Sequence, residues 1–313
     1  MNLKKESKIF LAGHNGMVGS AIHRYLKKKN YKNIIVSNKK QLDLLDQNKT
    51  LKFIKSKKPD FVIIAAARVG GINANNSFKG NFIYENLTIQ TNLIHASFLA
   101  GVRKLIFLGS SCVYPKFSKQ PIKEDYLLSG KLEETNDAYA IAKISGIKMC
   151  EAYNNQYGVN YICLMPTNLF GPNDNYDLKT SHFFPALIKK IYKAKKNNLK
   201  FIELWGNGKA QRELMYVDDL ADACEFFLRK KTKHSLINIG SGIEMPISGY
   251  CKYLMKKLRF DGKIKYDHKM PNGTPRKVLN CNLAKKYGWK SKIKLDEGLN
   301  LTLDYLKKNN NIL

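Results

Sequence analysis

The sequence has few acidic residues, and it has neither a paired-cysteine motif nor a long apolar run. Its 313 residues include 25 Asp and Glu against 54 Lys and Arg, which gives a formal net charge of +29. The six cysteines are scattered without a Cys-x-x-Cys pair, which argues against a zinc site and against a redox dithiol. We therefore expect no bound metal, and thiols that stay reduced.

No apolar stretch is long enough for a secretory signal or a membrane span. The first apolar run covers only residues 9–12, and the longest, residues 61–67, is far below the ~18 residues that cross a bilayer. We therefore expect a cytoplasmic protein without a membrane partner. The positive charge favours anionic partners, but the lysines are spread over the whole chain without interleaved aromatics. We interpret them as a solvated surface and expect no nucleic-acid partner.

Short apolar runs alternate with segments of helical periodicity in the first half of the chain. The segments 18–28, 86–100 and 138–157 have helical spacing, and strands are predicted at 8–13, 34–36, 61–66, 104–109 and 161–165. Strands this apolar are typical of a parallel sheet that is buried on both faces. The predicted fold class is α/β, a doubly wound parallel sheet of the Rossmann type with sites at the carboxyl ends of its strands.

The composition changes after Pro166, where Asn, Gly, Pro and Asp cluster over residues 168–177. We predict a dinucleotide-binding domain over 1–170 and a smaller substrate-binding domain over 171–313. Segments near 211–240 are expected to return to the first domain, with 237–240 as a further strand of its sheet.

A glycine-rich turn lies between the first predicted strand and the first predicted helix. Its glycines allow a tight turn and a close approach to a pyrophosphate at the helix N-terminus. We predict that it binds a dinucleotide through Gly13, His14, Asn15, Gly16, Met17, Val18 and Gly19. The second strand ends in a basic segment with Lys39 and Lys40 instead of the acidic residue typical of NAD sites, which favours NADP. Alternatively, these two lysines belong to the general lysine surplus.

Two serines, Ser110 and Ser111, follow the fourth predicted strand, and Tyr139 with Lys143 lies on the next helix. The Tyr-x-x-x-Lys spacing occurs four times in this lysine-rich chain, so spacing alone carries little weight. Only this pair follows a strand that ends in serines, and its spacing puts both side chains on one helix face. We predict that Tyr139 protonates a carbonyl oxygen as hydride arrives, while a serine hydrogen-bonds that oxygen. Lys143 is expected to lower the tyrosine pKa and to hold the nicotinamide ribose.

Cys112 stands two residues after the first of these serines, and His182 follows the polar loop. A thiolate beside a ketone is a competent base for the acidified neighbouring C–H bond, and a histidine on the opposite face can return the proton. The alternative is that Cys112 is a packed thiol and His182 a surface residue.

Together these segments resemble the GDP-L-fucose synthase family of extended short-chain dehydrogenases/reductases. The resemblance runs from about residue 8 to about residue 305, and the Ser-Ser-Cys and Gly-Thr-Pro-Arg-Lys blocks are more specific than the glycine turn. It rests on the segments 13–22, 65–72, 108–116, 139–144, 165–172, 181–182 and 273–277.

The resemblance implies an NADP-dependent enzyme that epimerises C3 and C5 of GDP-4-keto-6-deoxy-D-mannose and then reduces C4 to give GDP-L-fucose. It implies a reductase triad of Ser110, Tyr139 and Lys143, with Cys112 as the epimerisation base and His182 as the acid. The family's further cofactor contacts match Leu108, Gly109, Ser110, Ser111, Pro166, Thr167, Asn168, Leu169 and His182. Its GDP-sugar contacts match Lys190, Trp205, Arg212, Arg276 and Lys277.

The resemblance also implies a homodimer built from the helices around 86–100 and 138–157. Two positions depart from the family pattern. Lys190 stands where arginine is frequent, which keeps the charge but loses the bidentate grip on phosphate. Asn15 stands where relatives carry an arginine for the 2′-phosphate, a role that Lys39 and Lys40 would have to take. The rival interpretations are another nucleotide-sugar epimerase, dehydratase or reductase of this fold and, more remotely, a non-catalytic nucleotide- or RNA-binding protein.

Overall fold

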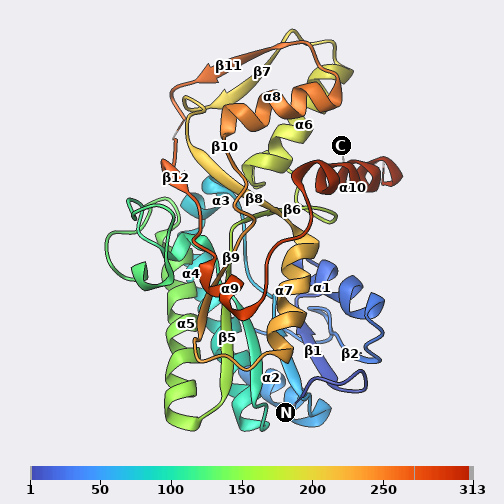
Figure 1. Cartoon of the computed structure of the whole chain (residues 1–313), viewed down its shortest axis with the longest axis vertical. Helices are drawn as coiled ribbons and strands as arrows, with labels where there is room; N and C mark the ends of the chain where they lie inside the picture. The colour runs from blue at the N-terminus through green and yellow to red at the C-terminus, as the bar shows by residue number, and fades with distance from the viewer. Residues whose placement is uncertain (1, 271, 310–313) are drawn as a thin grey trace.

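A six-stranded parallel sheet forms the centre of the molecule (Figure 1). The computed structural model describes residues 2–270 and 272–309. The strands follow the order β2-β1-β3-β4-β5-β9, with bounds β2 Asn33–Ile35, β1 Lys8–Ala12, β3 Phe61–Ile64, β4 Lys104–Leu108, β5 Asn160–Pro166 and β9 Leu236–Ile239. This confirms the α/β prediction, including the late return of 237–240 to the sheet.

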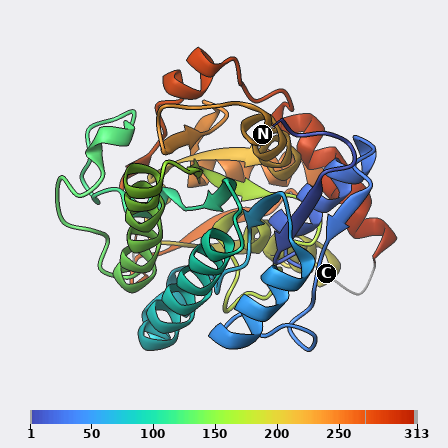
Figure 2. The same cartoon turned by 90° about the horizontal axis from the view of Figure 1, so that it is seen from below.

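Helices cover both faces of the sheet because successive strand residues point to opposite sides. In β1, Ile9 and Leu11 pack on one side and Phe10 and Ala12 on the other. The first side is covered by α1 (Met17–Lys28) and α7 (Val217–Arg229). The second is covered by α2 (Gln47–Lys57), α4 (Lys79–Leu99) and α5 (Asp137–Tyr157). Figure 2 shows α4 and α5 side by side on that face.

The direction of winding reverses at β1, which lies between β2 and β3. The loops that leave β1 and β3 therefore diverge and open a crevice at the carboxyl edge of the sheet. Such a switch point is where ligands bind in open α/β sheets.

A second apolar core lies beyond that edge, at the top of Figure 1. Its elements come from the second half of the chain, from β6 onward. A small sheet pairs β8 with β6, β10 and β12, and β7 pairs with β11. The bounds are β6 Asn168–Phe170, α6 Phe183–Lys196, β7 Phe201–Trp205, β8 Gln211–Tyr216, β10 Glu244–Pro246, α8 Ile247–Leu258, β11 Lys263–Asp267, β12 Arg276–Lys277 and α10 Leu295–Lys308.

Several elements were not predicted or begin elsewhere than predicted. Helix α4 begins at Lys79 and not near Asn86, whose buried side chain donates to the Phe82 carbonyl within the helix. The unpredicted short helices are α3 Ile72–Ser77, η1 Ser111–Val113, η2 Glu124–Tyr126 and α9 Asn282–Tyr287. Across the part of the chain that the structure describes, no helix combines the length and apolar character needed to cross a membrane.

Candidate functional site

A cavity of about 660 Å³ lies at the switch point of the sheet. It is lined by the whole glycine turn from Gly13 to Gly19, and by Lys39. It is also lined by the segments after β4 and β5, from Leu108 to Ser111 and from Pro166 to Leu169. Tyr139, Lys143 and His182 complete the predicted set. Lys40 is the one residue of that set that is not part of the lining.

The glycine turn has the shape that a pyrophosphate needs. Gly13 has a φ of +88°, and a Cβ on Gly19 would come within 2.0 Å of the Gly13 carbonyl oxygen, so α1 packs directly on the turn. A Cβ on Gly16 would instead have its nearest neighbour at 3.8 Å, which leaves open space above the helix N-terminus. In the described residues no side chain caps α1, so its first N–H groups are available to an anion. The residues present therefore fit a dinucleotide.

Lys39 is presented by a closed turn at the end of β2. The Asn38 N–H donates to the Gln41 side chain at 3.2 Å, and the Gln41 N–H donates to the Asn38 side chain at 3.0 Å. This reciprocal pairing fixes the backbone on either side of Lys39, whose side chain is exposed at the cavity. Of the two predicted lysines, Lys39 is the one positioned to meet a 2′-phosphate.

Ser110, Tyr139 and Lys143 meet at the carboxyl end of β4. The Lys143 Nζ donates to the Leu108 carbonyl at 2.8 Å and lies 5.8 Å from the centre of the Tyr139 ring. Ser110 is hydrogen-bonded to Tyr139, which lowers the pKa of the phenol, whereas burial raises it more strongly. Burial lowers the pKa of Lys143 to about 8. The lysine is thus directed at the strand end, and Ser110, not Lys143, is the group that favours the phenolate.

A second cavity of about 260 Å³ joins the first and extends between the two cores. Both cavities are lined by Ser110, Ser111, Tyr139, Asn168 and His182, which marks the place where a cofactor and a second ligand would meet. Cys112 lines the smaller cavity and Lys143 the larger one.

Cys112 and His182 are both enclosed at this junction. Cys112 is 6% exposed, and burial raises the pKa of its thiol, while Lys277, Ser110 and Lys143 lower it. His182 is the residue immediately before α6, and burial together with the charge of Lys277 lowers the pKa of its ring. Without a ligand the imidazole is therefore neutral at pH 7.

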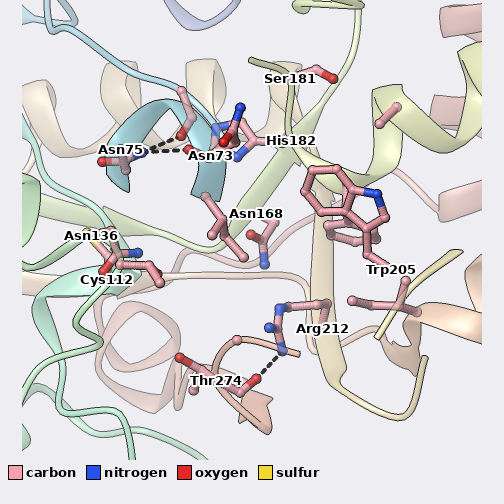
Figure 3. Close-up of a pocket in the computed structure, with 18 of the residues that line it drawn as sticks. Asn73, Asn75, Cys112, Asn136, Asn168, Ser181, His182, Trp205, Arg212 and Thr274 are labelled. Atoms are coloured by element: carbon pink, nitrogen blue, oxygen red, sulfur yellow. Dashed lines mark hydrogen bonds between the residues drawn. The ribbon is translucent and has the colours of Figure 1, made fainter. Parts of the chain in front are cut away.

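Basic and aromatic side chains line the far end of the smaller cavity. Figure 3 shows Cys112 and Asn136 at one end and Trp205 at the other. The Lys190 Nζ lies 5.5 Å from the centre of the Trp205 ring and donates to the Glu203 carbonyl at 2.9 Å. The buried Arg212 donates to the Thr274 carbonyl at 2.6 Å.

The two basic residues of the Gly-Thr-Pro-Arg-Lys block separate. Lys277 lines the smaller cavity with Lys190, Trp205 and Arg212. Arg276 does not line it and forms an ion pair with Glu244 on the surface. The alternation of side chains along β12 is the reason.

The structure also brings in polar residues that sequence reasoning did not assign. Three of these residues line the smaller cavity with a buried side-chain oxygen that has no hydrogen-bond partner among the described residues: Asn75 Oδ1, Asn136 Oδ1 and Ser181 Oγ. Such oxygens are the partners that sugar hydroxyls need. Glu133 lines the same cavity, and its Oε2 lies 3.2 Å from the Lys116 Nζ in an ion pair. Asn75 lies on the short helix α3, and no sequence signal placed it at the site. Glu133 and Asn136 lie on a long connection and had none.

The model of the NAD dependent epimerase/dehydratase family matches residues 9–240. The chain is 47% identical over 305 residues to GDP-L-fucose synthase 1 of Arabidopsis thaliana, covering 97% of this chain and 94% of that protein. A solved GDP-6-OMe-4-keto-L-xylo-heptose reductase from C. jejuni has a TM-score of 0.92 at 33% identity, covering 99% of this chain and 100% of that one. A GDP-L-fucose synthetase from Naegleria fowleri bound to NADP has a TM-score of 0.90 at 26% identity, covering 99% and 96%.

Proposed function

Because this chain belongs to the NAD dependent epimerase/dehydratase family, and within it to the GDP-L-fucose synthases, we propose that it converts GDP-4-keto-6-deoxy-D-mannose to GDP-L-fucose. The reaction comprises epimerisation at C3 and C5 and then NADPH-dependent reduction of C4. One observation carries the proposal. Ser110, Tyr139 and His182 line both cavities, while Cys112 faces only the one that would hold the sugar.

Epimerisation uses the acidity that the C4 ketone gives to its neighbouring C–H bonds. Cys112 removes a proton from one face of the sugar, and His182 returns a proton to the other face. His182 is neutral in the free protein. To act as the acid it must be protonated, and a nearby negative charge would stabilise the protonated ring. The diphosphate of the bound substrate brings negative charge into the cavity and raises the pKa of the ring toward neutrality.

Reduction follows, because it removes the ketone on which epimerisation depends. The glycine turn, Lys39 and Lys143 would hold NADPH, which would supply the hydride when bound. Tyr139 donates its phenolic proton to the C4 oxygen, and burial keeps that proton on the phenol until it is needed. Ser110 hydrogen-bonds the same oxygen, and Lys143 holds the cofactor's ribose.

The nucleotide end of the substrate fits the basic end of the smaller cavity. Lys190 and Arg212 supply positive charge for the diphosphate, and Trp205 supplies an aromatic face for the base. Arg276 is paired with Glu244, so we give it no part in holding the substrate.

We further propose a cytoplasmic homodimer that has no membrane or nucleic-acid partner and consists of a cofactor domain and a GDP-sugar domain. The dimer would use α4 and α5, on which the large apolar side chains of Tyr84 and Ile141 are 63% and 46% exposed. The two separate apolar cores support the division into two domains.

The test is to supply GDP-4-keto-6-deoxy-D-mannose with NADPH and to identify the product by NMR. The proposal requires NADPH oxidation and a product inverted at C3 and C5. No oxidation would contradict it. A product reduced at C4 with both centres unchanged would identify instead a C4 reductase, the activity that the name of the C. jejuni neighbour suggests.

A further inference from the structure

The Cys112 thiol needs a nearby cation if it is to act as a base. A free thiol has a pKa of about 8.5, and burial in an enclosed site disfavours the charged form further. The groups that favour a thiolate at Cys112 are Lys277, Ser110 and Lys143, with Lys277 the strongest. Tyr139 also faces the thiol, but as a buried phenol it stays uncharged and offers no compensation.

Of the two lysines, Lys277 is the better placed. The Lys143 Nζ is held by the Leu108 carbonyl and faces the cofactor cavity. Lys277 lines the same small cavity as Cys112, and no hydrogen bond or ion pair engages its ammonium among residues 2–270 and 272–309. The cavity in question is the one drawn in Figure 3.

The backbone fixes Lys277 relative to Cys112. Lys277 of β12 is in register with Arg212 of β8. The connection that leaves the Cys112 turn is bound to the same strand. The Gln120 side chain donates to the Arg276 carbonyl at 2.9 Å and accepts from the Val278 N–H at 3.1 Å. The residues on both sides of Lys277 are therefore held by the segment that carries the thiol.

The other charged groups around Lys277 come from three further elements. Burial lowers the pKa of Lys277, and Arg212 on β8 lowers it further. Cys112 raises this pKa, as does Glu133 on the connection before α5. Burial lowers the pKa of His182, immediately before α6, and the same ammonium lowers it further. One ammonium therefore acts on both the proposed base and the proposed acid.

We propose that the Lys277 ammonium stabilises the Cys112 thiolate that starts epimerisation. Lys277 is then a positioning residue that acts through Cys112, and not only a contact for the GDP-sugar. This inference rests on the proposed function for its role in catalysis. The effect of the Lys277 charge on the Cys112 pKa belongs to the free protein and does not depend on the identity of the substrate.

The first test titrates the free protein without any sugar. The ultraviolet absorbance of the thiolate is measured as a function of pH for the wild type and for each Lys277 variant. The curve of the same protein carrying Cys112→Ser is subtracted from each, which removes the signal of the other cysteines. Lys277→Met should raise the Cys112 midpoint by about 1 to 3 pH units, the usual effect of a close opposite charge. Lys277→Arg keeps the positive charge, so its Cys112 midpoint should stay near that of the wild type. Lys286→Met, on the exposed face of α9, is the matched control for the loss of one positive charge and should leave the midpoint unchanged.

Lys277→Gln is a second neutral variant in case the methionine does not fold. Unchanged midpoints in the neutral variants that fold would overturn the proposal. Equal shifts in Lys277→Met and Lys277→Arg would also overturn it, because they would show a steric effect.

A second test measures catalysis as deuterium exchange at C3 and C5 in D₂O without NADPH. At neutral pH the exchange rate should fall about tenfold for each unit of midpoint shift in Lys277→Met, and recover at high pH. A loss that does not recover would point to substrate binding alone and overturn the role in catalysis. If the wild type neither exchanges nor oxidises NADPH, the proposed function fails, while the titration still tests Lys277.

Discussion

At the scale of single residues, the proposed function gives two kinds of proton chemistry to a few neighbouring side chains. Ser110 touches both, because its Oγ accepts the Cys112 N–H at 3.4 Å and hydrogen-bonds Tyr139. Tyr139 faces both cavities, whereas Cys112 faces only the smaller one. A substitution at Cys112 should therefore affect one step and spare the other.

Cys112→Ser should slow epimerisation by about 10²- to 10⁴-fold, because a serine hydroxyl cannot serve as the base at neutral pH. Reduction of C4 should stay within a few fold of the wild type. NMR of the product would show a C4 alcohol with C3 and C5 unchanged. Cys281→Ser, a thiol outside both cavity linings, is the control. Normal GDP-L-fucose formation by Cys112→Ser would show that another group is the base.

Lys143→Met should lose C4 reduction but stabilise the protein at pH 7. The pKa of Lys143 falls from 10.5 to about 8 on folding, which costs about 3 kcal/mol while the lysine is protonated in both states. Below pH 8 this cost is fully present, and it disappears as pH rises through 10.5. Loss of the hydrogen bond to Leu108 offsets about 1 kcal/mol of the gain.

Urea unfolding at pH 7 and at pH 10.5 measures the effect. The variant should be more stable by about 1 to 2 kcal/mol at pH 7 and show no gain at pH 10.5. Lys148→Met removes an exposed charge from the same helix and should change stability by under ~0.5 kcal/mol. A destabilised Lys143→Met at pH 7 would contradict the assigned cost of burial.

At the scale of elements, the contact between β1 and α1 builds the cofactor site. The helix comes so close to the strand that Gly19 rests on the Gly13 carbonyl, while Gly16 faces open space. The two glycines therefore serve different purposes: Gly19 is required for packing and Gly16 for access by a ligand.

Alanine at each position should separate these purposes. Gly19→Ala should lower the free energy of unfolding by about 1 to 3 kcal/mol, because its Cβ meets backbone that cannot move aside. Gly16→Ala should change stability little but weaken NADPH binding by about tenfold, measured by fluorescence titration. Equal loss of stability in both variants would contradict this distinction.

At the scale of the whole molecule, the proposed dimer interface lies on α4 and α5, where the large apolar side chains of Tyr84 and Ile141 are exposed. We expect Tyr84→Glu with Ile141→Glu to convert the dimer to a monomer, since charges would be buried in the interface. Light scattering on the purified protein measures the mass. Leu301→Glu on α10, at a residue 45% exposed, is the control and should leave the dimer intact. A wild-type monomer would refute the proposed assembly directly.

Much of the fold was predictable because its signals are local. The apolar runs of β1, β3, β4 and β5 end where the structure ends them, within one or two residues. Helix α5 ends at Gly158, whose φ of +63° explains why the sequence signal was reliable there. The predicted start of α4 was wrong, because the helix begins at Lys79 and Asn86 is a buried residue within it.

The sequence by itself determined the sheet, the glycine turn and the proximity of Ser110, Tyr139 and Cys112, because spacing along strands and helices fixes which side chains share an edge or a face. Only the tertiary structure decided which of two adjacent basic residues faces the cavity, since Arg276 turns to Glu244 and Lys277 to Cys112. It also decided that Glu133 and Asn136 line the site. These choices depend on contacts between segments far apart in the chain, and no local pattern encodes them.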